Sequence, residues 1–441
     1  MTAVPPTSPG NILLVQPKAS EEAAYPLGLA QVAAVLKAEG ASVIGADLHF
    51  DRPREMVALA RAARVRWVGA SVLAHTAAQV GALFRRLRLA TGCGLFVQGA
   101  WPTLEPATAL AQTCADVAIR GDPERTVARL IRAGVPDRPF EGVALAHPGA
   151  PLLGDPAARV PLASLPLPDR EVFPVLRYSF AMRATATPYA AVFTSRGCGR
   201  VCPWCGVSAI RPTGFDGRAP EAVAEELAAL ARDHGVASVL VEDDHFLEAP
   251  DRVRALCALL IARRLPLALE LVNGVRPEAA EPELFGLLAR AGVARVVFGF
   301  EQLHAQAGAS PGCDMPTARR AVAIARGAGL RVGGYFIAGL PGVPVSTVLR
   351  GAALARELDL DDANFVPFYP APGSAWAGEP PGAAGAGWLA RAAQALFFSR
   401  PRSVTTLSRD LIREPRALGA MAKKALELVY EAGPVPVRDN P

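Results

Sequence analysis

Three cysteines stand close together near the middle of the chain, at Cys198, Cys202 and Cys205, directly after an apolar run. Their C-x3-C-x2-C spacing places three thiolates in one loop, and soft thiolates in such a group are typical metal ligands. Three protein thiolates hold only three irons of a four-iron cluster, so the fourth iron lacks a protein ligand. The motif therefore predicts a 4Fe-4S cluster with one iron open to a small molecule.

A zinc site or a set of buried thiols is the alternative interpretation of this motif. Structural zinc sites usually close a tetrahedron with two pairs of ligands. No second pair is present here, because His245, Cys257 and Cys313 each stand alone. The ligand count favours the cluster.

Composition narrows the classes of protein to which the chain can belong. Its 441 residues suffice for two or three domains. The 46 basic and 41 acidic residues nearly balance, so no nucleic-acid partner is indicated. No apolar run reaches the roughly 18 residues of a membrane span, the first residues lack a secretory signal, and the cysteines do not form a disulfide framework. We expect a cytoplasmic protein with no transmembrane segment.

The first part of the chain alternates short apolar runs with helical patterns. Five such βα units predict a parallel, doubly wound, Rossmann-like α/β domain over residues 1–134, with ligands outside the carboxyl ends of its strands. A nicotinamide or flavin site is disfavoured, since no G-x-G-x-x-G follows the first strand. The expected strands are 12–15, 43–47, 67–71, 95–98 and 117–119, and the expected helices are 27–39, 53–63, 79–90, 105–110 and 123–133.

A proline-rich linker over 135–188 separates this domain from a second βα alternation over 189–376. Six further βα units predict a partial (β/α)6 barrel, whose chemistry belongs at the carboxyl ends of the strands. A basic helical region is expected over 377–441. The expected barrel strands are 191–194, 238–242, 268–272, 295–300, 331–337 and 363–367, and the helices are 220–233, 251–263, 282–291, 317–326 and 346–358.

The cysteine motif, preceded by Thr194-Ser195-Arg196-Gly197 and with an aromatic before its third cysteine, resembles the radical SAM superfamily. The resemblance covers residues 10 to 376. It implies that the open iron chelates S-adenosylmethionine (SAM) and that one electron splits SAM into a 5′-deoxyadenosyl radical. It also implies a set of SAM-binding residues at the strand ends: Trp204 (adenine), Glu242 and Asp243 (methionyl amine), Asn273, Arg276 (carboxylate), Glu301 (ribose) and Gly339.

Loops of the first domain resemble the cobalamin-binding domain found ahead of many radical SAM domains. A Ser-x-Leu at Ser71 and a glycine at Gly99 flank the expected nucleotide tail, with Ala100 in place of a second glycine. The Asp-x-His-x-x-Gly motif is absent after the first strand, so the implied cobalamin is base-off and has no histidine ligand. The residues implied to bind it are Tyr25, Pro26, Leu27, Gly28, Ser71, Leu73, Gly99, Ala100, Trp101, Pro102 and Gly121.

Together the two resemblances imply a cobalamin-dependent radical SAM C-methyltransferase. Its substrate is expected to be a small molecule, lipid or peptide, and its electron donor a reducing partner such as flavodoxin or ferredoxin. Three alternatives stay open: ring formation or contraction without methyl transfer, a radical SAM enzyme whose first domain has lost cobalamin, and a metal-binding module without catalysis. A doubly wound fold does not by itself establish a cofactor site.

Overall fold

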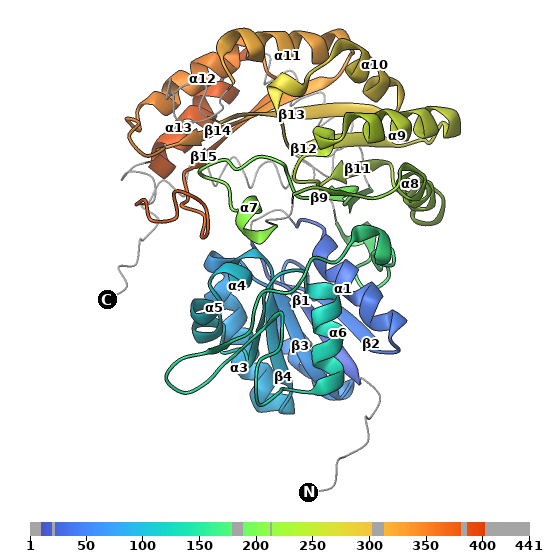
Figure 1. Ribbon diagram of the computed structural model, residues 1–441, viewed down its shortest axis with the longest axis vertical. Coiled ribbons are helices and arrows are strands. Elements are labelled where there is room, and N and C mark those ends of the chain that lie inside the picture. The colour runs from blue at the N-terminus through green and yellow to red at the C-terminus, as the bar shows by residue number, and fades with distance from the viewer. Residues whose placement is uncertain are drawn as a thin grey trace, which may run out of the picture. The chain divides into compact units, whose positions relative to one another are not determined.

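The structure is a computed structural model that describes residues 10–19, 23–178, 188–211, 214–301, 313–380 and 386–401. The chain forms two compact units, residues 1–178 with 209–212 and residues 179–208 with 213–441. Figure 1 shows their helices and strands. No helix in the described part of the chain is long and apolar enough to cross a membrane.

The first unit is built on a seven-stranded sheet in the order β2-β1-β3-β4-β5-β6-β7. Strands β1 to β5 are parallel, which confirms the predicted doubly wound fold. The strand order reverses between β1 and β3, so the carboxyl ends of these strands form the switch point where such sheets bind ligands. The strands are β1 Asn11–Gln16, β2 Ser42–Asp47, β3 Val65–Ser71, β4 Gly94–Gln98, β5 Val117–Ile119, β6 Val143–Leu145 and β7 Leu152–Leu153.

Helices cover both faces of this sheet. Helices α1 and α6 contact one another, and α3 contacts both α2 and α5 (Figure 1). The α-helices are α1 Leu27–Ala38, α2 Pro53–Ala62, α3 Ala77–Thr91, α4 Ala100–Leu104, α5 Pro106–Thr113 and α6 Pro123–Ala133. Three 3-10 turns complete the unit: η1 Ala74–Thr76, η2 Leu162–Ser164 and η3 Val175–Arg177.

Residues 135–178 differ from the proline-rich linker expected from the sequence. They contribute β6 and β7, which extend the sheet as antiparallel strands, and they belong to the first unit. The reason is physical: β6 has three residues, all buried, and β7 has two. Strands this short carry no readable alternation between apolar and polar residues.

The second unit contains a six-stranded parallel sheet in the order β15-β14-β13-β12-β11-β8. Its end strands β8 and β15 do not pair with each other in this order, so the predicted partial barrel is confirmed as open. A short antiparallel pair, β9 with β10, lies on either side of the cysteine loop in sequence. The strands are β8 Tyr189–Val192, β9 Ser195–Arg196, β10 Asp216–Gly217, β11 Ser238–Val241, β12 Ala268–Val275, β13 Val293–Glu301, β14 Arg331–Ala338 and β15 Asp362–Pro367.

Helices α8 to α12 line one face of this sheet (Figure 1). Helix α13 packs against α12 and β15, and the Gln394 side chain satisfies the edge of β15 by donating to Ala363 O at 2.7 Å and accepting from Phe365 N at 3.2 Å. The helices are α7 Val207–Ile210, α8 Pro220–His234, α9 Pro250–Arg263, α10 Pro282–Arg290, α11 Met315–Gly327, α12 Thr347–Glu357 and α13 Ala386–Phe398, with turns η4 Phe246–Glu248 and η5 Pro277–Ala279. Most of the basic C-terminal region, residues 402–441, lies outside the described residues.

A buried group of charges fastens the amino ends of the barrel strands together. Arg295 on β13 donates to Asp362 on β15 at 2.7 Å and to Glu270 on β12 at 3.2 Å. Ser238 on β11 also donates to Glu270, at 3.2 Å. Although burial alone would lower the pKa of Arg295, the carboxylates of Asp362 and Glu270 raise it, so the guanidinium stays charged. Four strands therefore share one ion cluster.

Replacing Arg295 by methionine should destabilise the second unit by about 3–5 kcal/mol, because it leaves the carboxylate of Glu270 buried without a counter-ion. Hydrogen exchange of the backbone amides in β12 to β14 measures this loss as a fall in the free energy of opening.

The matched control is Arg254→Met, which breaks an ion pair with Glu281 at 2.7 Å in which both side chains are at least one-third exposed. We expect it to cost less than about 1 kcal/mol. Equal effects of the two variants would contradict a stabilising role for the buried cluster.

Candidate functional site

A cavity of about 160 Å³ lies in the second unit, among the loops that follow β8, β11, β12 and β13. The three motif cysteines, Cys198, Cys202 and Cys205, all line it. The carboxyl ends of parallel strands meet at one edge of a sheet, which is why loops so far apart in sequence gather here. The other lining residues are Arg200, Trp204, Val207, Asp244, His245, Asn273, Gly274, Arg276, Pro277, Glu278, Gly299, Phe300, Glu301 and Cys313.

Two carboxylates that follow β11 hold the start of the cysteine loop. Asp243 is buried and accepts from Thr194 N at 2.6 Å and from Ser195 Oγ at 2.5 Å. Asp244 accepts from Gly197 N at 2.6 Å. Gly197 has φ of +87°, and a Cβ there would lie 1.9 Å from Gly214 O, so only glycine fits. The loop therefore leaves β8 along a fixed path.

The three thiols suit a cluster by their chemistry. Burial, together with the neighbouring Cys205 and Cys198, raises the pKa of Cys202 to about 11. Burial also raises the pKa of the Cys198 and Cys205 thiols. The thiolate is the form of cysteine that binds metal. Three thiolates close together are therefore unfavourable unless positive charge lies among them. Within the described residues no three His, Cys, Asp or Glu side chains converge on a single metal ion. A four-iron cluster takes one thiolate per iron and needs no such convergence.

Arg276 forms an ion pair on the wall of the cavity. Its Nη2 donates to Glu248 Oε2 at 2.9 Å, and its backbone N–H donates to His245 Nε2 at 3.3 Å. The proton of neutral His245 must then sit on Nδ1, which lies 3.2 Å from Glu248 Oε2. Burial, Arg276 and Arg200 lower the pKa of His245 to about 3, so the ring is neutral. The buried Arg276 Nε has no hydrogen-bond partner among the described residues.

Glu301 closes β13 beside the cluster motif. Its backbone has φ of +31°, a strained value for a residue with a side chain. Burial raises the pKa of its carboxyl to about 7. A Cβ on Gly299 would lie 2.9 Å from Glu301 Oε1, so the glycine leaves room for this carboxyl.

An aromatic cluster supports the other side of the cysteine loop. Trp204 packs against Trp376 with ring centroids 5.8 Å apart, and Trp376 packs edge-on against Phe368 at the same distance. The backbone N–H of Trp376 donates to Pro203 O at 3.0 Å. The segment after β15 is therefore tied to the cysteine motif by both packing and a hydrogen bond.

The first unit has its own group of loops at the carboxyl ends of β3, β4 and β5. Gly99 has φ of +116°, and Thr103 Oγ1 donates to Gly99 O at 2.7 Å while accepting from Gly121 N at 3.1 Å. This hydroxyl joins the two glycine loops. Beside them, the buried Oε1 of Gln98 has no hydrogen-bond partner among the described residues.

Two family models match separate parts of the chain. The B12 binding domain matches residues 19–131, and the Radical SAM superfamily matches residues 192–354. The chain is a radical SAM protein with a B12-binding domain. The first unit holds the B12-binding domain and the second unit the radical SAM domain.

Two curated proteins are similar to this chain over part of its length. The chain is 26% identical over 279 residues to an uncharacterized methyltransferase of Pyrococcus horikoshii, covering 59% of this chain and 57% of that protein. It is 24% identical over 229 residues to cytidylyl-2-hydroxyethylphosphonate methyltransferase of Streptomyces wedmorensis, covering 48% and 42%. The chain thus spans about half the length of the curated relatives it matches.

Structures of the radical S-adenosylmethionine methyltransferase TsrM from Kitasatospora setae share the fold. Two of them, one with cobalamin and a [4Fe-4S] cluster, superpose with a TM-score of 0.67 at 18% identity. They match 83% of this chain and 75% or 77% of the TsrM chain.

In this radical SAM protein, the cavity gathers most of the residues that were predicted to bind the cluster and SAM, but not all. Besides the cysteines, Trp204, Asn273, Arg276 and Glu301 line it. Three predicted residues do not line it in the described structure: Glu242, Asp243 and Gly339. Asp243, predicted at the methionyl amine, accepts hydrogen bonds from Thr194 and Ser195.

The cavity also contains residues that the sequence did not single out. Asp244 and His245 line it, and Glu248 pairs with Arg276 although no motif marks it. Cys313, which stands alone in the sequence, lines the same cavity as the motif cysteines. Cys313 could not be predicted to lie near the motif cysteines because it is far from them in sequence.

The predicted cobalamin-binding residues differ in burial, from exposed through half-buried to buried. Gly28 has no atom within 4 Å of an added Cβ, and Leu73 is exposed. Tyr25, Leu27 and Trp101 are buried. The remaining predicted residues are Pro26, the N-cap of α1; Ser71, the last residue of β3; Gly99, Ala100 and Pro102, at the start of α4; and Gly121, in the loop after β5.

Replacing Cys202 by alanine should abolish cluster incorporation, because only two of the three thiolates that hold the four-iron cluster would remain. Iron content and the visible absorbance of anaerobically reconstituted protein measure the effect.

Cys313→Ala is the matched control, since it removes a thiol from the same cavity but outside the motif. Its iron content should equal that of the wild type. Loss of iron in Cys313→Ala with full iron in Cys202→Ala would overturn the ligand assignment.

Proposed function

We propose that this chain is a cobalamin-dependent radical SAM enzyme that transfers a methyl group to a carbon of a small-molecule, lipid or peptide substrate. The observation that carries the proposal is the cavity in which Cys198, Cys202 and Cys205 face Arg276 and Asn273, in a chain that also has a B12-binding domain. Both curated relatives are named methyltransferases, and the structural neighbour TsrM is named a radical SAM methyltransferase.

The three thiolates are proposed to hold the cluster and leave one iron free. When bound, the cluster supplies the electron that splits SAM into methionine and a 5′-deoxyadenosyl radical, and methylcobalamin supplies the methyl group. The protein positions these groups and excludes water from them. A reducing partner such as flavodoxin or ferredoxin is proposed to deliver the electron.

Arg276 is proposed to bind the carboxylate of SAM. Glu248 already fixes one of its amino groups, which orients the planar guanidinium without using its Nε. A carboxylate that accepts from Nε would satisfy a buried donor, and charge-assisted bonds of this kind are among the stronger hydrogen bonds in proteins. Asn273, near the carboxyl end of β12, offers further hydrogen bonds.

Different roles are proposed for Glu301, Trp204 and Asp243. Glu301 is proposed to accept from the ribose hydroxyls, and Trp204 to contact the adenine while Trp376 supports its other side. Asp243 is proposed to position the cysteine loop, because Thr194 and Ser195 already satisfy its carboxylate.

Cobalamin is proposed to lie over the glycine loops of the first unit, with no histidine on its lower face. The unpartnered Gln98 Oε1 offers an acceptor there to a donor of the ligand. Within the first unit, His49 lies in an Asp-x-His sequence, and its Nδ1 lies 2.8 Å from Asp47 Oδ1 at the end of the edge strand β2. Asp47 also accepts from Tyr178 OH at 3.0 Å, so His49, Asp47 and Tyr178 form a polar cluster with one another.

Replacing Gly99 by leucine should remove cobalamin but leave the iron cluster, because a side chain at φ of +116° both strains the loop and fills the expected path of the nucleotide tail. Cobalt and iron contents after anaerobic reconstitution measure the effect, and 5′-deoxyadenosine and methylated product measure activity.

Gly92→Leu is the matched control. It also places a side chain at positive φ, +68°, but just before β4, at the amino end of that strand, where no atom lies within 4 Å of the new Cβ. Cobalamin retained in Gly99→Leu would refute the proposed placement. Wild-type protein that forms 5′-deoxyadenosine without any methylated product would instead favour a rearrangement.

A further inference from the structure

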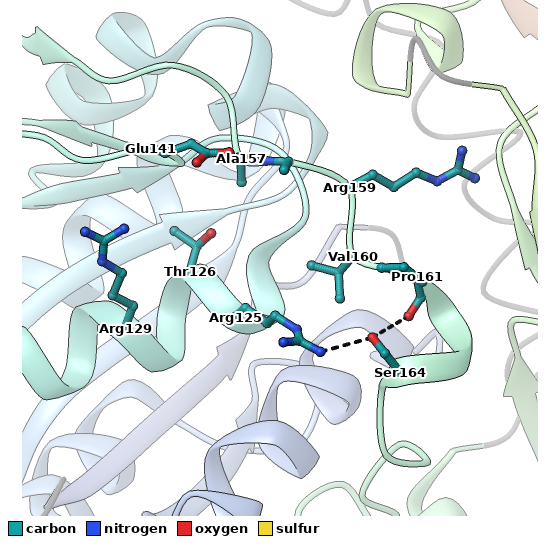
Figure 2. A pocket seen from close by; sticks show the side chains of 10 residues that line it. Arg125, Thr126, Arg129, Glu141, Ala157, Arg159, Val160, Pro161 and Ser164 are labelled. Carbon is teal, nitrogen blue, oxygen red and sulfur yellow. Dashed lines mark hydrogen bonds between the residues drawn. The ribbon is translucent and has the colours of Figure 1, made fainter.

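A second cavity, of about 450 Å³, lies within the first unit along helix α6, and we name it the α6 cavity (Figure 2). Its walls come from α6, from Glu141 before β6, and from the segment that runs from Ala157 to Ser164. Its volume is in the range of small-molecule sites, about 300–1,000 Å³. Neither the cluster motif nor the glycine loops contribute to it.

Of the three arginines that line this cavity, Arg125 and Arg129 lack an acidic partner among the described residues. Arg125 donates to the neutral Ser164 Oγ at 3.2 Å, and Arg129 lies over the Phe140 ring at 4.0 Å from its centroid. Among the described residues neither forms an ion pair. Arg132 on the same helix, outside the cavity, instead pairs with Glu39. The unneutralised positive charge of α6 is therefore concentrated in the cavity.

The walls are fixed before any ligand binds. Ala157 N donates to Arg120 O at 2.8 Å, and Val160 N donates to the buried Asp122 at 3.0 Å. Ala158 N donates to Glu141 Oε1 at 2.7 Å, so one oxygen of this carboxylate is already used. A site that is ordered in advance loses less conformational entropy on binding.

Figure 2 shows that Arg125 and Arg129 leave α6 in different directions, with Thr126 between them. The surface of the cavity also includes Ala157, Val160 and Pro161, which are apolar. Cations that point apart, with apolar wall nearby, suit an elongated molecule with a negative group at each end. Guanidinium forks bind phosphate and carboxylate groups in the same bidentate way.

We propose that the α6 cavity binds a small organic molecule with a phosphate or carboxylate group at each end, whose acidic groups are held by Arg125 and Arg129 and whose uncharged body lies against Ala157 and Val160. The site is separate from the proposed methyl-transfer chemistry. Glu141 disfavours a third negative group and favours a body with hydroxyl donors.

The experiment is calorimetric titration of the full chain with fructose 1,6-bisphosphate and with adipate, which carry phosphates or carboxylates at their two ends. We expect saturable one-to-one binding of at least one probe, and the better probe identifies the anionic group. Arg125→Gln and Arg129→Gln should each weaken binding about tenfold or more, because each removes a charge-assisted contact. Arg132→Gln, the matched control, should bind as the wild type does.

Several results would overturn the proposal. These are no saturable binding of either probe, an equal loss in Arg132→Gln, inorganic phosphate binding as tightly as the organic probes, or a hexaglutamate peptide binding more tightly than both. The last result would assign the surface to an acidic protein instead. Unchanged iron and cobalt contents in the variants would show that the outcome is independent of the proposed methyltransferase function.

Discussion

The buried carboxylate of Asp243 determines where the cysteine loop begins. Burial raises its pKa, while hydrogen bonds from Ser195 and Thr194 act in the opposite direction by stabilising the charged form. A carboxylate buried without such donors would destabilise the protein by several kcal/mol. The donors are therefore held at the end of β8, and Gly197 then turns the chain towards the cavity. The hydrogen bonds of Asp243 thus help to position the three thiols, although these lie in a loop.

The barrel strands carry the stabilising ion cluster near their amino ends and the residues of the candidate site near their carboxyl ends. β12 carries Glu270 near its amino end and Asn273 near its carboxyl end, and β13 carries Arg295 and Glu301 in the same arrangement. The charges at the amino ends satisfy one another, whereas Glu301 at the carboxyl end has a strained backbone and a raised pKa. Strain of this kind persists only where the surrounding structure holds it.

The sequence predicted most elements because alternating βα patterns are long and regular, and it predicted the cluster motif because its ligands are adjacent. It failed where local pattern carries no information. Strands β6 and β7 are too short to show a period. After β11 three carboxylates follow in a row, and only the loop backbone decides that Asp244, and not Asp243, lines the cavity. Glu248 and Cys313 belong to the site through tertiary structure alone.

Arg276 shows why a site residue often needs a partner that no motif records. A guanidinium alone at the cavity wall would be free to rotate, and ordering it on binding would cost conformational entropy. Glu248 orders it beforehand and also faces the protonated Nδ1 of His245, so one carboxylate oxygen lies near two donors. The buried Nε remains unsatisfied, which destabilises the free protein slightly. An acceptor that enters the cavity removes this penalty, so the arrangement favours a ligand with a carboxylate over a neutral ligand of the same shape.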